Sequence, residues 1–243
     1  SMLIDDFKAY SEPCFRDCPP PCVTACPLGL DVKAVIDKVQ RKNFTAAFRL
    51  YRNQVLFPAI VSRLCPEPCR GQCVRKNTDQ GVFMRKIEAA CVEFSKDSKP
   101  IAFNVPAKPF TVAVVGAGLS GLSCALKLAS RNYSVKIYEK SGNWGGRLRG
   151  LLPEDVFLTD LGSQFSAVKY EAEFNRPVSG LAEIEADAVY VATGPDGSDF
   201  GLRDQLNRQS LCTSRPGVFL GGGLLGTGPM GSTAQGIPAS SPI

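Results

Sequence analysis

The cysteines of this chain restrict its fold and chemistry more than any other residue type does. Eight of the ten cysteines lie within the first 91 of the 243 residues. A first group, spaced four residues apart, consists of Cys14, Cys18, Cys22 and Cys26. A second group with the same spacing consists of Cys65, Cys69 and Cys73, and Cys91 follows alone. Because the chain contains no histidine, thiolates and carboxylates are the main side chains left for holding a metal, and catalysis by imidazole is excluded.

Disulfides, zinc and iron–sulfur clusters could each explain these cysteines, and each requires different features of the sequence. Disulfides need an oxidising compartment, whereas residues 1–6 lack the basic and apolar regions of a secretory signal, so we expect a cytoplasmic location. Zinc sites more often show Cys-x2-Cys or Cys/His knuckles. A cysteine run whose last member precedes proline, as Cys26 precedes Pro27, is typical of iron–sulfur ligation. Iron–sulfur ligation is therefore favoured, and seven or eight thiolates suit two [4Fe-4S] clusters.

The segment between the two cysteine groups predicts helices. Apolar residues in 31–55 recur at spacings of three and four, and Asp31 and Asn43 are suited to cap two successive helices. Residues 98–110 hold three prolines and little periodicity, which is typical of a linker. We therefore expect a helical domain over 1–97 and a second domain over 111–243.

A dinucleotide fingerprint opens the second domain. The β-branched run 111–115 leads into Gly116-Ala117-Gly118-Leu119-Ser120-Gly121, a helical pattern covers 119–130, and a second strand ends at Glu139. In such a unit the first glycine permits a tight turn, the second admits the pyrophosphate, and the third packs the helix on the strand. The acid then accepts hydrogen bonds from ribose hydroxyls. The context predicts a nucleotide site.

Further residues suited to this cofactor site follow along the chain. After Glu139 they are Lys140, Gly145, Gly146, Arg147 and Leu148. Thr193 and Gly194 follow one buried strand, and Gly222 and Gly223 follow another. Lys140, Arg147 and Arg149 are equally explained as surface charges or as cations that balance an anionic reduced flavin.

These motifs together resemble the small subunit of NADPH-dependent glutamate synthase and the corresponding parts of dihydropyrimidine dehydrogenase and of bifurcating transhydrogenases. The resemblance covers nearly the whole chain and includes 57–66, which leads into the second cysteine group, and 145–153. It implies an α + α/β architecture: a helical N-terminal domain with two [4Fe-4S] clusters, followed by a Rossmann-like domain that binds FAD.

The resemblance also implies a distribution of ligands. Cys14, Cys18, Cys22 and Cys73 would bind one cluster, and Cys26, Cys65 and Cys69 would bind three irons of the other. The last ligand is Glu88 by position or Cys91 by the affinity of sulfur for iron, with Glu88 favoured. The chain departs from the family in the Cys14–Cys18 spacing and at Gly223, where an acid normally holds the ribityl chain of the flavin.

In that family, a second dinucleotide domain, for NAD(P)H, lies between the strand that precedes Thr193 and the strand that precedes Gly222. Only residues 195–216 separate those strands here, and a βαβ unit needs about 30 residues or more. We therefore expect this nicotinamide domain to be absent, and a partner protein to supply the hydride donor or the substrate site.

The leading functional hypothesis is an electron-transfer subunit of a larger oxidoreductase. The alternatives are a stand-alone NAD(P)H-dependent flavin reductase and a non-enzymatic redox scaffold or sensor. No catalytic acid or base can be assigned from the sequence. The net charge of +5 comes from scattered residues, so no nucleic-acid partner is expected. No apolar run approaches the roughly 20 residues of a membrane span.

Overall fold

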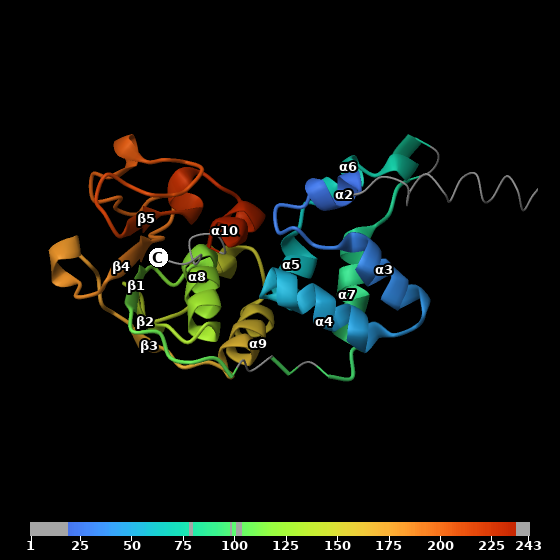
Figure 1. The fold of residues 1–243 in the computed structure, drawn as a ribbon, viewed down its shortest axis with the longest axis horizontal. Helices are drawn as coiled ribbons and strands as arrows, with labels where there is room; N and C mark the ends of the chain where they lie inside the picture. Colours follow the sequence, from blue (N-terminus) through green and yellow to red (C-terminus); the bar gives the residue numbers. More distant parts are fainter. Residues whose placement is uncertain (1–18, 78–79, 98, 101–103, 237–243) are drawn as a thin grey trace, which may run out of the picture. The chain divides into compact units, whose positions relative to one another are not determined.

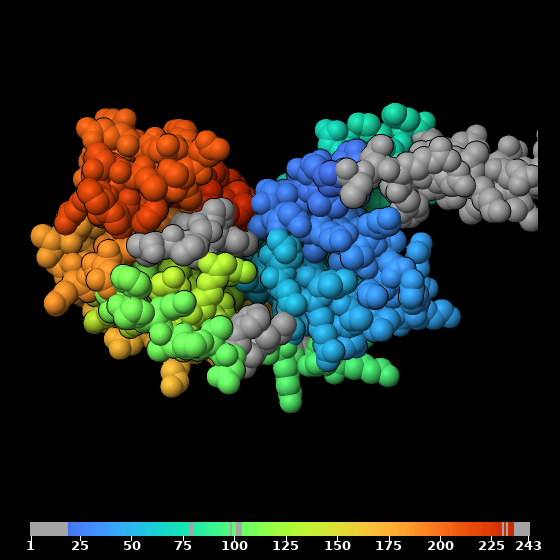
Figure 2. Space-filling model, viewed as in Figure 1, coloured from blue at the N-terminus to red at the C-terminus, as the bar shows by residue number. Residues whose placement is uncertain are grey.

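A computed structural model describes residues 19–77, 80–97, 99–100 and 104–236. The chain divides into two compact units, Ser1–Ser98 and Lys99–Ile243. Blue to cyan mark most of the first unit in Figures 1 and 2, and green to red mark the second. Of the expected linker, residues 98 and 101–103 lie outside the described ranges. None of the helices in the described part of the chain combines the length and apolar character that crossing a membrane requires.

Short helices make up the described part of the first unit. They are α2 (Pro21–Thr24), α3 (Val32–Gln40), α4 (Phe44–Val55), α5 (Pro58–Leu64), α6 (Pro68–Gly71), the 3₁₀ turn η2 (Val74–Asn77) and α7 (Met84–Phe94). The side chain of Asp31 accepts a hydrogen bond from the backbone N–H of Ala34, and Asn43 accepts one from Ala46. Both predicted caps are present, and they fix where α3 and α4 begin.

The core of the first unit forms where α4 packs against α3 and α7. The buried face of α4 includes Phe48 and Tyr51, whose side chains are 2% and 0% exposed. On α7 the buried residues are Met84, Glu88 and Cys91, which share one face because they are spaced by four and three positions. A carboxyl and a thiol are thus carried into the interior of this helical unit.

The second unit is built around a five-stranded sheet in the order β3-β2-β1-β4-β5, with every pairing parallel. Its elements are β1 (Thr111–Val115), α8 (Leu119–Ser130), β2 (Ser134–Tyr138), η3 (Gly146–Gly150), α9 (Glu154–Phe165), β3 (Glu171–Glu173), η4 (Leu181–Glu183), β4 (Ala188–Val191), η5 (Arg203–Gln205), β5 (Val218–Leu220), η6 (Gly222–Leu225) and α10 (Pro229–Gly236). Figure 1 shows α8 beside this sheet, and α8 packs on α10. The predicted combination of a helical domain and a Rossmann-like domain is confirmed.

The strand order places a topological switch point at β1. The chain leaves β1 toward β2 on one side, and β4 later returns to the other side of β1. Ligands of open parallel sheets bind in the crevice at such a point, beyond the carboxyl ends of the strands. Between β4 and β5, residues 192–217 contain the turn η5 and reach an isolated antiparallel bridge from Cys212 to Phe219, with no βαβ unit in this stretch.

Candidate functional site

A pocket of about 380 Å³ opens at the carboxyl ends of β1 and β4. It contains most of the cofactor residues expected from the sequence: Gly116, Gly118, Leu119, Ser120, Glu139, Lys140, Gly145, Gly146, Arg147, Leu148, Thr193, Gly194 and Gly223. Sequence reasoning missed Leu151, Ala192, the loop 195–197 and residues 227–229, which complete the lining. The loop 195–197 and residues 227–229 belong to no motif, because what brings them here is the meeting of strand ends that are distant in sequence.

The three fingerprint glycines meet different surroundings. Gly116 has a φ of +105°, and a Cβ there would collide with the carbonyl of Ala192. A Cβ on Gly121 would collide with the carbonyl of Gly116, so only glycine lets α8 approach the turn. A Cβ on Gly118 would meet no atom within 4 Å. The space beside Gly118 is therefore open to a ligand.

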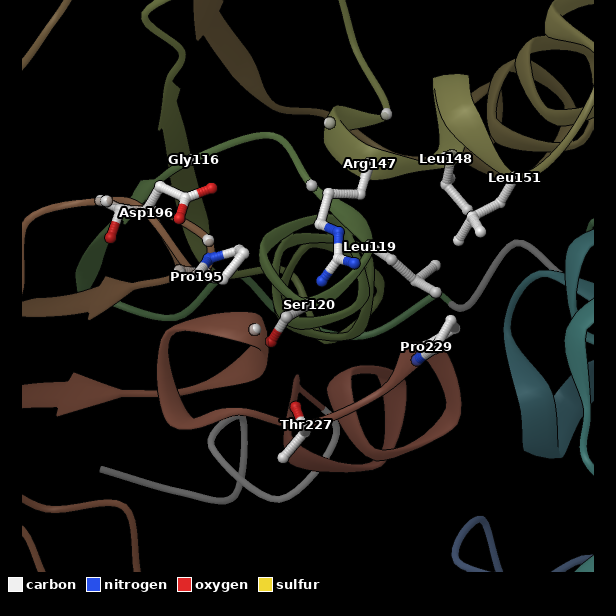
Figure 3. A pocket seen from close by; sticks show the side chains of 18 of the residues that line it. Gly116, Leu119, Ser120, Arg147, Leu148, Leu151, Pro195, Asp196, Thr227 and Pro229 are labelled. Carbon is white, nitrogen blue, oxygen red and sulfur yellow. The ribbon is translucent and has the colours of Figure 1, made fainter.

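The start of α8 suits an anion. Gly118 is the N-cap of this 12-residue helix, and no side chain caps the helix. Backbone N–H groups in the first turn and the helix dipole together favour phosphate at such an end. Figure 3 shows α8 nearly end-on, with the side chain of Arg147 extending over Leu119 and Ser120. The pocket therefore has the backbone and the cation that a pyrophosphate needs.

The carboxylate of Glu139 is fixed beside this cradle. Its Oε2 accepts from the backbone N–H of Ala117 at 2.7 Å, and its Oε1 accepts from the backbone N–H and the hydroxyl of Ser141, both at 2.8 Å. The side chain is largely buried. Because a carboxylate oxygen accepts two hydrogen bonds, Oε2 keeps a position for a ribose hydroxyl. Glu139 thus clamps the glycine loop as well as lining the pocket.

Four of the residues expected at the cofactor site do not line the pocket. Arg149 turns away to pair with Glu154 at 2.7 Å and does not line the pocket, although Lys140 and Arg147 do. The N–H of Gly222 donates to Oε1 of Gln235 at 2.6 Å, so it is not offered to a ligand. Ala117 and Gly121 also lie outside the lining: the N–H of Ala117 donates to Glu139, and Gly121 lets α8 approach the turn.

In the first unit, the charges of Cys26 and Glu88 act on Cys65 and Cys69. Burial raises the pKa of the Cys65 thiol to about 11, and the charges of Glu88 and Cys26 add to the increase. Burial also raises the pKa of Cys69 to about 12, and Cys65, Glu88 and Cys26 add to it. Three segments that are distant in the sequence, those of Cys26, Cys65–Cys69 and Glu88, therefore lie close enough for their charges to interact. Buried thiols with raised pKa values are poor nucleophiles, and a metal would be needed to hold them as thiolates.

Glu88 and Cys91 differ in their relation to this group. Burial raises the pKa of Glu88 to about 7, and a hydrogen bond from the Tyr51 hydroxyl, 3.4 Å from Oε2, opposes the increase. Burial raises the pKa of Cys91 to about 11, and of the other groups only Glu88 adds to it. The charges that act on Cys65 and Cys69 include Glu88 and do not include Cys91. Of the two residues, Glu88 is thus the one whose charge acts on Cys65 and Cys69.

The ligands expected for the other cluster are described only in part. Cys14 and Cys18 lie outside the described residues. Helices α2 and α6 pack together, which brings the segment of Cys22 beside that of Cys73. Among the described cysteines, Cys26, Cys65, Cys69, Cys73 and Cys91 form no disulfide. No three metal-binding side chains of the described residues converge on a single ion, whereas the four ligands of a [4Fe-4S] cluster bind four different irons.

Comparison with known proteins identifies both units. Residues 5–99 match the family model described as dihydropyrimidine dehydrogenase domain II, 4Fe-4S cluster, and residues 114–174 match an NAD(P)-binding Rossmann-like domain. The chain therefore joins a 4Fe-4S domain to a dinucleotide-binding Rossmann domain. The resemblance found in the sequence is confirmed.

Several of the curated relatives are named as subunits of oxidoreductases. The beta subunit of NADPH-Fe(3+) oxidoreductase from Geobacter sulfurreducens is 32% identical over 190 residues, which cover 72% of this chain and 28% of the relative. The beta subunit of NADP(+)-dependent formate dehydrogenase from Moorella thermoacetica is 28% identical, covering 72% and 29%. Subunit PreT of NAD-dependent dihydropyrimidine dehydrogenase from Escherichia coli O157:H7 is 29% identical, covering 84% and 56%. The chain thus spans 28% to 56% of the length of these three relatives.

Proposed function

We propose that this chain is an electron-transfer part of a larger oxidoreductase and that it holds one FAD and two [4Fe-4S] clusters. The observation that carries the proposal is a pocket with a phosphate cradle and a fixed carboxylate, on the same chain as a helical 4Fe-4S domain with buried cysteines. When bound, FAD exchanges electrons in pairs or singly, and each cluster carries one electron at a time.

FAD is proposed rather than NAD(P) because of the glycine pair 145–146 that lies against the fingerprint. The lining runs from Glu139 past the start of α8 to the loop after β4 and the start of α10. Gly145 and Gly118 pair as neighbours, which places the glycine pair 145–146 against the fingerprint. The lining residues would thus contact a bound dinucleotide from its adenosine end, past its phosphates, to the group at its other end. Lys140 and Arg147 would balance the negative charge of the phosphates.

The residues proposed to hold the clusters follow from position. Cys26, Cys65, Cys69 and Glu88 would hold one cluster, with Glu88 as the fourth ligand because its carboxyl acts on Cys65 and Cys69. Cys14, Cys18, Cys22 and Cys73 would hold the other. Thiolate ligands persist in a reducing compartment, and we therefore propose that the protein works in the cytoplasm.

A partner would supply the substrate chemistry. The charged groups of the pocket are Glu139, Lys140, Arg147 and Asp196, and the first three are accounted for by binding the dinucleotide. The names of the relatives describe three different substrates: ferric iron, formate and a dihydropyrimidine. A common electron-transfer part joined to different substrate-specific parts would explain how one architecture serves all three.

Anaerobic purification of the chain, followed by iron, sulfide and flavin analysis, tests the proposal. We expect about eight irons and eight sulfides, as two [4Fe-4S] clusters require, together with one FAD for each chain. Zinc in place of iron, or protein without flavin after reconstitution with FAD, would contradict it. NADPH added alone should leave the flavin oxidised, because the hydride donor site is assigned to a partner; rapid bleaching would instead favour a stand-alone reductase.

A further inference from the structure

Asp196 is the one charged residue of the pocket lining that has no role in the site described above. Its side chain is exposed on the loop after β4, and it makes no hydrogen bond or ion pair with any described residue. Glu139, by contrast, is engaged at both oxygens by Ala117 and Ser141. Asp196 therefore keeps its full capacity to accept hydrogen bonds from a ligand.

The backbone around Asp196 is a fixed turn. The N–H of Gly197 donates to the carbonyl of Gly194 at 3.1 Å, which closes a β-turn with Pro195 and Asp196 at its centre. Proline suits the first central position of such a turn because its φ is already fixed. The hydroxyl of Thr193 donates to the carbonyl of Ser198 at 2.8 Å and ties the ends of the loop together. Asp196 is thus presented at the tip of an ordered turn.

The same turn closes off the end of β5. A Cβ built on Gly223 would lie 3.0 Å from Cδ of Pro195, tighter than an ordinary contact. A side chain at position 223 would therefore displace the turn, so Gly223 offers the pocket no side-chain acceptor. Asp196 follows Pro195 directly. It therefore brings a carboxylate to the neighbourhood of position 223, where glycine has no side chain.

Arg147 and Asp196 lie in different parts of the pocket. Arg147 extends over the start of α8, where phosphates would bind, and Figure 3 shows Pro195 and Asp196 on the opposite side of the pocket from Leu151 and Pro229. A carboxylate repels phosphate but forms strong hydrogen bonds with hydroxyl groups. The partner that fits Asp196 is therefore an uncharged polyol segment of the ligand.

We propose that Asp196 accepts hydrogen bonds from the polyol chain of the bound dinucleotide, which is the ribityl chain if the ligand is FAD. The residue thereby replaces an acceptor that the end of β5 does not provide. The inference rests on the proposed function, because it assumes that the pocket holds FAD.

The test compares two ligands that share the adenosine and phosphate ends. FAD carries the ribityl hydroxyls and ADP does not, so titrations of flavin-depleted full-length protein with each ligand separate the two ends of the pocket. We expect Asp196→Asn to weaken FAD binding by about tenfold, since one charge-assisted hydrogen bond contributes about 1.5–3 kcal/mol and the amide oxygen recovers part of it. ADP binding should change less than about twofold.

Two variants control the comparison. Asp204→Asn removes one negative charge from an exposed residue of the same connector, outside the pocket lining, and should leave both affinities unchanged. Asp196→Glu keeps the charge and should retain more FAD affinity than Asp196→Asn. Unchanged FAD affinity in Asp196→Asn, or an equal loss for FAD and ADP, would overturn the inference alone. Failure of the unmodified protein to bind FAD would overturn the proposed function and this inference with it.

Discussion

The hydroxyl oxygens of Ser120 and Tyr190 lie 2.7 Å apart inside the second unit. Tyr190 belongs to β4 and is 1% exposed, whereas Ser120 lies in the first turn of α8 and also lines the pocket. Burial raises the pKa of Tyr190, the charge of Cys124 raises it further, and the hydrogen bond with Ser120 opposes this. The phenol therefore stays protonated at any physiological pH. This hydrogen bond joins the helix that opens the phosphate cradle to the strand that ends beside it.

Replacing Tyr190 with phenylalanine should destabilise the second unit. The Ser120 hydroxyl would remain buried without its partner, and the expected loss is about 1–2 kcal/mol in the free energy of unfolding. Chemical denaturation followed by the fluorescence of Trp144, the single tryptophan of the chain, measures it. Trp144 reports on this unit because it packs edge-on against Phe165 with ring centroids 5.0 Å apart.

The double variant Ser120→Ala with Tyr190→Phe provides the control for that prediction. Removing both polar partners avoids an unsatisfied buried group, so the double variant should be more stable than the sum of the two single effects predicts. Strict additivity would show that the two hydroxyls do not depend on each other.

Two alanine substitutions in the fingerprint should have different consequences. In Gly121→Ala the new methyl group collides with the carbonyl of Gly116, so we expect loss of the folded second unit, seen as loss of the cooperative Trp144 transition. In Gly118→Ala the methyl group meets no protein atom, so the unit should fold. FAD content should nevertheless fall in Gly118→Ala, because the methyl group occupies the space of the pyrophosphate. Normal FAD content in that variant would show that the phosphates bind elsewhere.

Replacing Glu139 with arginine should lower FAD retention and loosen the glycine loop. The change removes the acceptor for the Ala117 N–H and places a cation where a ribose hydroxyl would bind. The flavin-to-protein ratio after gel filtration measures retention, and the milder Glu139→Gln should retain an intermediate amount. Equal occupancy in all three proteins would mean that another residue holds the ribose.

The sequence predicts those parts of the fold that depend only on neighbouring residues, such as strands, helices and helix caps. The β-branched run and the glycine fingerprint predicted β1 and α8, and the side chains of Asp31 and Asn43 predicted where α3 and α4 begin. Contacts across the fold are not predictable in this way. That Arg149 pairs with Glu154 depends on where η3 meets α9, and the hydrogen bond between Ser120 and Tyr190 joins residues 70 positions apart. Asp196 lies on a loop with no motif, and the pairing of β4 with β1 brings it to the pocket.

The choice between Glu88 and Cys91 as the fourth ligand of one cluster is open to direct test. Because the Glu88 carboxyl acts on Cys65 and Cys69 and the Cys91 thiol does not, Glu88→Gln should alter the electron paramagnetic resonance of one reduced cluster, whereas Cys91→Ala should leave both spectra unchanged. A matched Cys212→Ser, at an exposed thiol of the second unit, should behave like the unmodified protein. Loss of a cluster signal in Cys91→Ala, with Glu88→Gln normal, would assign the ligand to the thiol instead.

Removing a ligand of that cluster should leave the flavin in place. Cys26→Ala is expected to lose about four of the eight irons assigned to the chain, because one cubane would lack a thiolate. FAD content and the Trp144 unfolding transition should stay normal, since the dinucleotide pocket is lined entirely by residues of the second unit. Iron analysis and the flavin absorbance of the same sample give both readouts. Loss of flavin together with iron would mean that the two units do not fold independently.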